Sequence, residues 1–185
     1  MEHQVRLKHF DGSGFNKGAG GGKIILWYFI NALLVRPSWI PFMGFKVFLL
    51  RLFGAKIGKC ICLKPCVLIK SPWNLTIGDY CWIGENVWID NLDKVYIGNN
   101  VCISQGALLL TGNHDYTVSS MPYRNAPINI EDGVWVGGKA IICSGVTAHK
   151  NAVLTVGSIA TKDLDAEGIY QGNPATKIRQ RIIKK

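Results

Sequence analysis

A repeat of six residues runs through most of this 185-residue chain and limits what the chain can fold into. Within groups of three, an aliphatic residue recurs at every sixth position. The positions are Ile57, Leu63, Ile69; Ile77, Ile83, Ile89; Ile97, Ile103, Leu109; Ile130, Val136, Ile142; and Ala148, Leu154, Ala160. An amphipathic helix would repeat every 3.6 residues and a half-buried strand every two residues, so neither element explains the pattern.

Extra residues enter this repeat only after every third position. The spacing between groups is six, eight or twenty-one residues, while the spacing inside each group stays at six. That is the expected signature of a coil with three short strands per turn, in which insertions are tolerated at one corner. A parallel β-solenoid stacks such coils so that their aliphatic side chains form continuous internal ladders, and glycines at the corners would permit unusual backbone angles.

The sequence therefore predicts an all-β solenoid of about five coils over residues 55–166, with an inserted loop at 113–127. A β-sandwich is the alternative fold. It would not keep one phase of six from residue 57 to residue 160.

The segments before the repeat differ from it in composition. Residues 1–23 are polar and glycine-rich and lack the features of a secretory signal. Residues 24–54 hold two apolar stretches separated by prolines, and we expect two helices that either cover one end of the core or lie on a membrane surface. Because each stretch is too short to cross a bilayer, the expected localisation is cytoplasmic, with peripheral attachment to the inner membrane surface as the alternative.

The formal net charge of +9 favours an anionic partner, such as nucleic acid, an acidic membrane surface or a phosphorylated ligand. No nucleic-acid recognition motif accompanies the basic C-terminal segment, so we expect no nucleic-acid partner. We interpret residues 167–185 as a loop and a basic helix that caps the solenoid. The six cysteines form no CxxC pair, and we expect small, buried residues and no metal site.

Three further segments carry a family resemblance: VWVGGKAIICSGVT (134–147), TVGSIATKD (155–163) and GNPATKIR (172–179). With the hexads, they resemble the hexapeptide-repeat acyltransferases over about residues 48–183. The upstream segments RPSW, LLRLFGAKIGK and PWNLTIGDYCWIG are most similar to the colanic-acid-type O-acetyltransferases of exopolysaccharide synthesis. The resemblance implies a left-handed β-helix, a homotrimer, and acetyl-coenzyme A bound in a groove between neighbouring solenoids.

His114 opens the long interruption of the repeat. Acetyl transfer from a thioester to a sugar hydroxyl needs a base for the hydroxyl proton, and a neutral imidazole suits that task. Judged by its residue type alone, a lone loop histidine is more often solvated than catalytic. Its position matches the catalytic histidine of the sugar acetyltransferases, so the resemblance implies that His114 is the general base of a direct transfer. Asp115 could orient the imidazole or stabilise a turn.

The resemblance also implies binding residues. Coenzyme A would contact Gly138, Lys139, Val156, Thr161, Lys162 and Arg179, with Arg179 at the 3′-phosphate. Lys139 could equally be surface charge. Asp90 and Asn91 lie at the corner one coil below the loop, where they could bind the acceptor or form turns through side-chain to backbone bonds.

Three functions remain open. The leading hypothesis is acetyl-CoA-dependent O-acetylation of a sugar or lipid-linked sugar precursor in exopolysaccharide biosynthesis. N-acetylation of an amino sugar or of a small antibiotic-like acceptor would use the same base. A non-catalytic solenoid scaffold would need neither His114 nor its loop.

Overall fold

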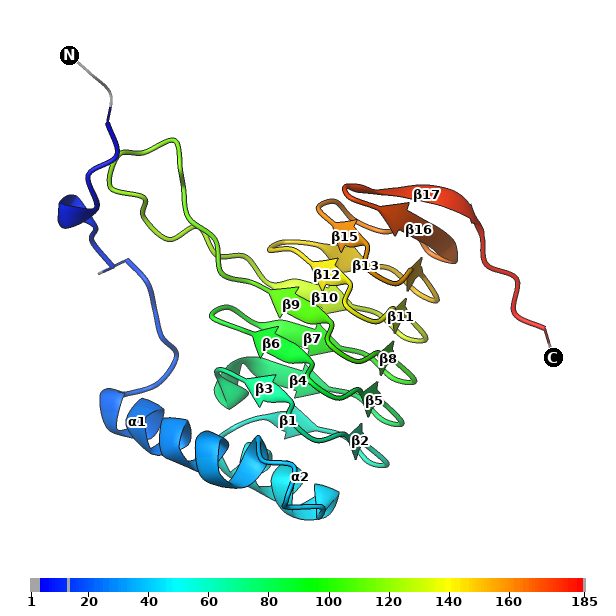
Figure 1. The fold of residues 1–185 in the computed structure, drawn as a ribbon, viewed down its shortest axis with the longest axis horizontal. Coiled ribbons are helices and arrows are strands. Elements are labelled where there is room, and N and C mark those ends of the chain that lie inside the picture. The colour runs from blue at the N-terminus through cyan, green and yellow to red at the C-terminus, as the bar shows by residue number, and fades with distance from the viewer. Residues whose placement is uncertain (1–3, 13, 185) are drawn as a thin grey trace.

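The computed structural model describes residues 4–12 and 14–184, and its centre is a three-sided stack of short parallel strands (Figure 1). Each coil gives one strand to each of three sheets. Sheet A contains β1 (Lys56–Ile57), β4 (Leu75–Ile77), β7 (Val95–Ile97), β10 (Ile128–Ile130) and β13 (Thr147–Ala148). Sheet B contains β2 (Cys62–Leu63), β5 (Trp82–Ile83), β8 (Cys102–Ile103), β11 (Trp135–Val136) and β14 (Val153–Leu154). Sheet C contains β3 (Leu68–Ile69), β6 (Trp88–Asp90), β9 (Leu108–Leu110), β12 (Ile141–Ile142) and β15 (Ile159–Ala160).

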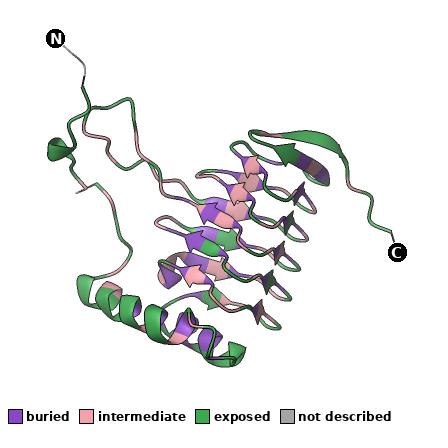
Figure 2. Ribbon diagram, in the orientation of Figure 1, coloured by how far each residue is buried: buried purple, intermediate pink, exposed green. Residues whose placement is uncertain are grey.

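The register of these strands confirms the predicted ladders. In sheet B, for example, Ile83 pairs with Leu63 of the coil before and with Ile103 of the coil after. Every predicted ladder position except Ile57 is at most 2% exposed, and the buried stripe runs along the inside of the stack (Figure 2). Five complete coils thus close around one aliphatic core, whose removal from water is the main stabilising term.

The glycines that follow the ladder positions serve a different purpose from the one we predicted. Gly84 and Gly137 do not adopt the left-handed backbone conformation; that conformation occurs two residues later, at positions such as Asn86 and Lys139. A Cβ atom on Gly84 would lie 2.6 Å from the amide nitrogen of Gln105 in the next coil, and one on Gly137 would lie 2.6 Å from that of Val156. These glycines are required because successive coils approach each other closely.

The two predicted N-terminal helices are confirmed, and they cover the end of the stack formed by the first coil (Figure 1). They are α1 (Gly21–Ile30), which continues into the π-helical turn η2 (Asn31–Val35), and α2 (Met43–Leu52). Trp27 and Leu50 are buried against the core, and the Trp27 indole donates a hydrogen bond to the carbonyl of Ile69 at 3.0 Å. This bond satisfies a carbonyl at the last strand of the first coil, where no earlier coil can do so.

The predicted C-terminal helix is wrong. Residues 168–180 form a hairpin instead: β16 (Gly168–Gly172) extends sheet B in parallel with β14, and β17 (Ala175–Gln180) folds back antiparallel to it. Tyr170 continues the ladder above Leu154. The open edge of β16 carries backbone N–H and C=O groups that an antiparallel strand can pair and a helix cannot, which favours the hairpin.

The cysteine prediction holds only in part. Cys81 is buried, four cysteines are half-buried, and Cys60 is exposed. Cys60 occupies a corner between two strands, in the left-handed conformation with φ of 55°.

The N-terminal segment runs along the inserted loop between β9 and β10 (Figure 1). A short 3-10 turn, η1 (Leu7–His9), follows a hydrogen bond from the Arg6 amide to the carbonyl of Ser119 at 2.8 Å. Farther along, Phe10 and Phe15 each contact the ring of Tyr123. The segment that we predicted as a polar tail therefore packs on the loop that carries His114.

Candidate active site

The inserted loop, residues 111–127, leaves sheet C at the end of β9 and returns to sheet A at β10. Its two arms pair with each other around a bridge between His114 and Tyr123. The Asp115 amide donates to the carbonyl of Pro122 at 2.9 Å, and the Arg124 amide donates to that of Asn113 at 2.8 Å. The loop is thus an ordered arm that extends from one corner of the solenoid.

The His114 imidazole makes one hydrogen bond that decides its chemistry. Its Nδ1 lies 2.7 Å from the carbonyl oxygen of Met121. A carbonyl oxygen can only accept, so Nδ1 carries a proton, and in the neutral ring the lone pair is therefore on Nε2. This tautomer leaves Nε2 as a proton acceptor, which is the form that a general base requires.

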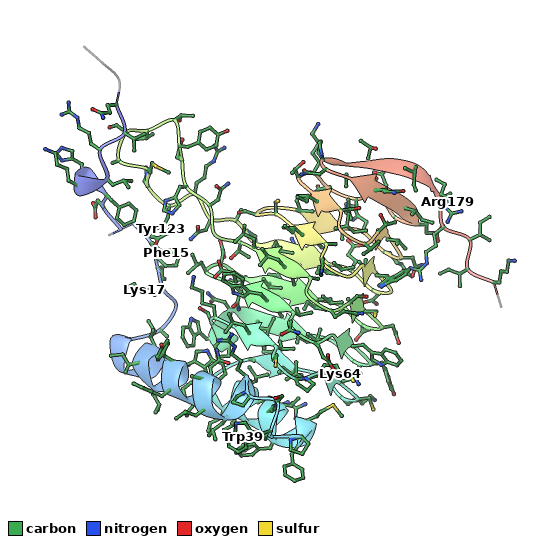
Figure 3. All side chains as sticks on the ribbon, viewed as in Figure 1. Phe15, Lys17, Trp39, Lys64, Tyr123 and Arg179 are labelled. Atoms are coloured by element: carbon green, nitrogen blue, oxygen red, sulfur yellow. The ribbon has the colours of Figure 1, made fainter. Side chains whose placement is uncertain are left out.

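Aromatic rings hold the imidazole from two sides. The Tyr123 ring stacks on it with centroids 4.8 Å apart and an interplanar angle of 28°, and the Phe10 ring meets it edge-on at 6.0 Å. Figure 3 shows Tyr123 beside Phe15 of the N-terminal segment, at a centroid distance of 4.8 Å. The sequence reasoning missed these partners because Phe10 and Phe15 lie in a glycine-rich stretch with no periodic pattern.

Asp115 does not orient the imidazole. Its Oδ1 accepts hydrogen bonds from the amide of Thr117 at 3.0 Å and from the hydroxyl of Thr117 at 2.5 Å. These bonds stabilise the carboxylate and lower the pKa of Asp115. Asp115 therefore stabilises the turn, and the Met121 carbonyl takes the orienting role.

The two predicted acceptor-binding residues are both buried: Asp90 is the last residue of β6, and Asn91 begins the corner that follows. The Asn91 side chain accepts from the Ser71 amide at 2.9 Å and donates to the Ser71 carbonyl at 2.6 Å, which ties the second coil to the first. Asp90 pairs with the ammonium of Lys70 at 2.8 Å. Asn91 is 0% exposed, so in this structure it bonds to backbone and has no surface for a ligand.

A cavity of about 500 Å³ lies between the N-terminal segment and the solenoid. We name it the N-terminal cavity. Its lining includes Phe10, Phe15, Lys17, Lys70, Trp73 and Tyr123. Two of these residues, Phe10 and Tyr123, also contact the His114 ring, so the cavity adjoins the candidate base. The cavity thus combines aromatic faces with two lysines, one of which, Lys70, is paired with Asp90.

The predicted coenzyme A residues lie in three places. Gly138, Lys139 and Val156 lie at the corner between sheets B and C, in the fourth and fifth coils. Gly138 has no left-handed backbone angle, and an added Cβ would make only ordinary contact, 3.4 Å from the Gln105 carbonyl oxygen. Neither the backbone conformation nor the neighbouring atoms require glycine at position 138. The lack of a side chain there would instead allow an extended ligand arm to pass close to the backbone at this corner.

The remaining predicted residues lie elsewhere. Thr161 and Lys162 are exposed after β15, at the same corner as the His114 loop but two coils farther along. Arg179 is exposed on β17, opposite Ile169 (Figure 3). Within one chain, the width of sheet C separates His114 from Gly138. Among residues 4–12 and 14–184, no group of three His, Cys, Asp or Glu side chains could hold a metal ion.

Comparison with known proteins identifies relatives along nearly the whole chain, although no protein-family model matches it. The chain is 38% identical to WcaF of Escherichia coli, which is assigned as a colanic acid biosynthesis acetyltransferase, over 93% of this chain and 97% of that protein. It is 32% identical to the galactoside O-acetyltransferase of Escherichia coli, over 68% of this chain and 64% of that protein.

A solved structure has a similar fold. The hexapeptide-repeat acetyltransferase VCA0836 of Vibrio cholerae superposes with a TM-score of 0.77 and 25% identity, covering 88% of this chain and 94% of that protein. The same protein complexed with acetyl-coenzyme A superposes with a TM-score of 0.74 and 24% identity, over 99% of this chain and 100% of that protein. At 24% identity, the similarity to the acetyl-coenzyme A complex is a similarity of fold.

Proposed function

The chain belongs to the hexapeptide-repeat acetyltransferases, and from that premise we propose that it transfers an acetyl group from acetyl-coenzyme A to a hydroxyl group of a sugar. The sugar would be a free or lipid-linked precursor of an exopolysaccharide. The similarity to WcaF along almost the full length of both chains supports this acceptor class.

The observation that carries the proposal is the 2.7 Å hydrogen bond between His114 Nδ1 and the Met121 carbonyl. It leaves Nε2 of His114 free to take the proton of the acceptor hydroxyl. The resulting alkoxide oxygen attacks the acetyl carbon, the carbon–sulfur bond breaks, and the coenzyme A thiolate leaves with the proton returned from the imidazolium. No acyl-enzyme is needed, because the acceptor attacks the thioester directly.

We propose the N-terminal cavity as the acceptor site. A sugar ring there could stack on aromatic faces such as that of Trp73, whose indole is held by a 2.8 Å hydrogen bond to the Lys17 carbonyl. The Asp90–Lys70 pair lies at the cavity's edge, so Asp90 would act through Lys70 rather than by touching the acceptor.

For acetyl-coenzyme A, we propose the corner strip of Gly138, Lys139 and Val156 for the extended arm, and Thr161, Lys162 and Arg179 for the nucleotide end. The absence of a side chain at Gly138, where a Cβ would be tolerated, supports the first assignment. Exposed cationic side chains at Lys162 and Arg179 are suited to phosphate groups.

We further propose a homotrimer in which each active site is shared. His114 and Gly138 lie on opposite sides of sheet C, so one chain does not bring the base to the corner strip. A neighbouring solenoid that presents its corner strip to the His114 loop would complete the site.

Replacement of the base tests the proposal. His114→Ala should lower kcat by about 10²–10⁴-fold in a thiol-release assay over a panel of sugars and amino sugars, because it removes the group proposed to take the acceptor proton. The panel also distinguishes O-acetylation from N-acetylation. The proposal fails if kcat with the best acceptor falls less than about tenfold.

His149→Ala is the matched control. That imidazole is paired with Glu131 at 3.0 Å on the surface, where both side chains are almost half exposed. Its removal should change kcat by less than about twofold, since an exposed pair contributes little.

A further inference from the structure

One end of the molecule exposes a broad apolar surface. We name it the helical end face, and it is formed by η2, both helices and the turn between them. Its large exposed side chains are Ile25, Leu26, Tyr28, Phe29, Leu33, Trp39, Phe42, Met43, Phe45, Phe48 and Leu52. Each of them is at least 41% exposed, and Trp39, at 72%, lies on the outer side of this end (Figure 3). A contiguous apolar surface of this kind marks an interaction site.

The opposite side of the same helices already packs on the solenoid. Trp27, Val35, Leu49 and Leu50 are buried in the core. The helices therefore have two apolar faces, and no described part of the chain covers the outer one. An amphipathic helix in a soluble monomer has one apolar face, so the second requires an occupant.

The net charge of the chain is concentrated in the sequence segment that contains this face. Residues 12–78 contain nine of the 21 Lys and Arg residues and none of the 12 Asp and Glu residues. The rest of the chain carries twelve of each sign, so the whole net charge of +9 belongs to this segment. Such segregation is unusual for a surface whose only task is solubility.

Several cationic groups lie in the parts of the chain that adjoin the apolar face. Arg36 follows η2, and Lys56, Lys59 and Lys64 are exposed on the first coil, which the helices cover. Lys59 lies 4.0 Å from Asp79, a distance that leaves most of its charge available. Lys46 does not contribute, because it is buried and bonded to the Pro37 carbonyl, and Arg51 donates to the carbonyls of Ile57 and Gly58.

We propose that the helical end face binds the surface of an anionic lipid bilayer, with α1 and α2 lying flat at the interface. Aromatic and aliphatic side chains would enter the boundary between headgroups and acyl chains, and the positive charge of the adjoining segment would attract lipid phosphates. A second copy of the chain fits less well, since it would bring the same positive charge against this one with no acidic residue in either segment. No helix within the described residues combines the length and the apolar character needed to cross a bilayer, so the attachment is peripheral.

This inference does not depend on which acceptor the enzyme uses. It does place the N-terminal cavity, which Ile24 of α1 helps to line, close to the bilayer surface, where a lipid-linked sugar would be found. Failure of vesicle binding would overturn the docking surface and leave the acetyl transfer unaffected.

Sedimentation of the full chain with phosphatidylcholine vesicles, with and without phosphatidylglycerol, tests the electrostatic part. The wild type should bind the anionic vesicles much more tightly than the neutral ones, and added salt should weaken that binding. The combined variant Lys56→Gln, Lys59→Gln, Lys64→Gln should lower the partition coefficient about a hundredfold, at about fivefold per charge. The control Lys94→Gln, Lys150→Gln, Lys184→Gln removes the same charge elsewhere and should change it by less than about threefold.

The apolar part is tested by Trp39→Ser, Phe42→Ser, Phe48→Ser, with Ile178→Ser, Ile182→Ser at the other end of the chain as the control. All five side chains are more than half exposed, so both variants should fold, as circular dichroism would check. The first variant should lose vesicle binding and the second should keep it. In the wild type, brominated lipids should quench Trp39 fluorescence, and Trp39→Phe should remove that quenching.

The proposal is overturned if the lysine variant and its control bind the vesicles equally, or if the wild type binds neutral and anionic vesicles alike. It is also overturned if the wild type fails to bind vesicles and the triple serine variant forms a smaller assembly than the wild type in analytical ultracentrifugation. The face would then be an interface between copies of the chain.

Discussion

The side chains of His114 and Lys46 each form a hydrogen bond to a backbone carbonyl, and the two carbonyls belong to different residues. The Met121 carbonyl holds the proton of His114 on Nδ1, and the Pro37 carbonyl receives the ammonium of Lys46 at 2.9 Å. The two cases differ in solvation: His114 is half-buried at a loop, while Lys46 is 2% exposed. Its burial lowers the pKa of Lys46, because the charged form loses hydration that one carbonyl does not replace.

That shift predicts how stability depends on pH. Between the lowered pKa of folded Lys46 and the ordinary lysine value of about 10.4, the unfolded chain binds the proton more tightly than the folded chain. The free energy of unfolding of the wild type therefore rises with pH through that window. Lys46→Met removes the buried charge and should be more stable by about 1 kcal/mol at pH 7, with an advantage that shrinks towards pH 10. Urea denaturation of both proteins across this range measures the difference, and a difference independent of pH would contradict it.

At the scale of elements, no strand of the solenoid could persist alone. The strands of the five coils, β1 to β15, have two or three residues, and each pairs only with its neighbours along the stack. Their stability comes from the ladders that run through all coils. A defect at one rung should therefore be felt as a loss of packing between neighbouring coils.

Ile83 offers a test at the middle of one ladder. It is 0% exposed and lies between Leu63 and Ile103. Ile83→Ala should lower the free energy of unfolding by about 2–5 kcal/mol, and Ile83→Val by about 0.5–1.5 kcal/mol. Equal losses in chemical denaturation would contradict a closely packed ladder.

The predictability of each element follows from its contacts. The ladders were predictable because pairing between coils repeats the same side chain every six residues, and the position of the loop followed from the one long break. The β16–β17 hairpin was not, because a free strand edge, rather than any pattern in residues 168–180, favours it. The contacts of Phe10 and Phe15 with the loop are long-range and have no periodic signal.

The candidate site was predictable to a similar extent. His114 stood out because it opens the break, but its partner is the backbone of Met121, which carries no information in its residue type. Asn91 attracted notice as a polar residue at a corner, and its two bonds to Ser71 give it a structural task. The positions proposed for coenzyme A came from family motifs, and they remain predictions.

For the whole molecule, the separation of His114 from the corner strip predicts complementation between subunits. His114→Ala and Gly138→Phe should each be inactive alone, the second because a ring would fill the strip. When the two variants are co-expressed, they should regain about a quarter of the wild-type activity. In a randomly mixed ring, about one shared site in four would combine an intact His114 from one subunit with an intact Gly138 from its neighbour. Thiol release by the copurified mixture measures this. Activity no higher than that of the separate variants would contradict a shared site.

The position of the inserted loop has an evolutionary consequence. Residues 111–127 leave and re-enter at one corner, while β9 and β10 keep the same register as every other strand. Thr111 is buried and bonded to Asp90 and Asp93, and Ala126 bonds to Ser144, but the part of the segment between them can lengthen, shorten or change its composition with little cost to the solenoid. Selection for a new acceptor would therefore act on one short, replaceable stretch of the gene. Descendants with very different specificities would keep the same solenoid.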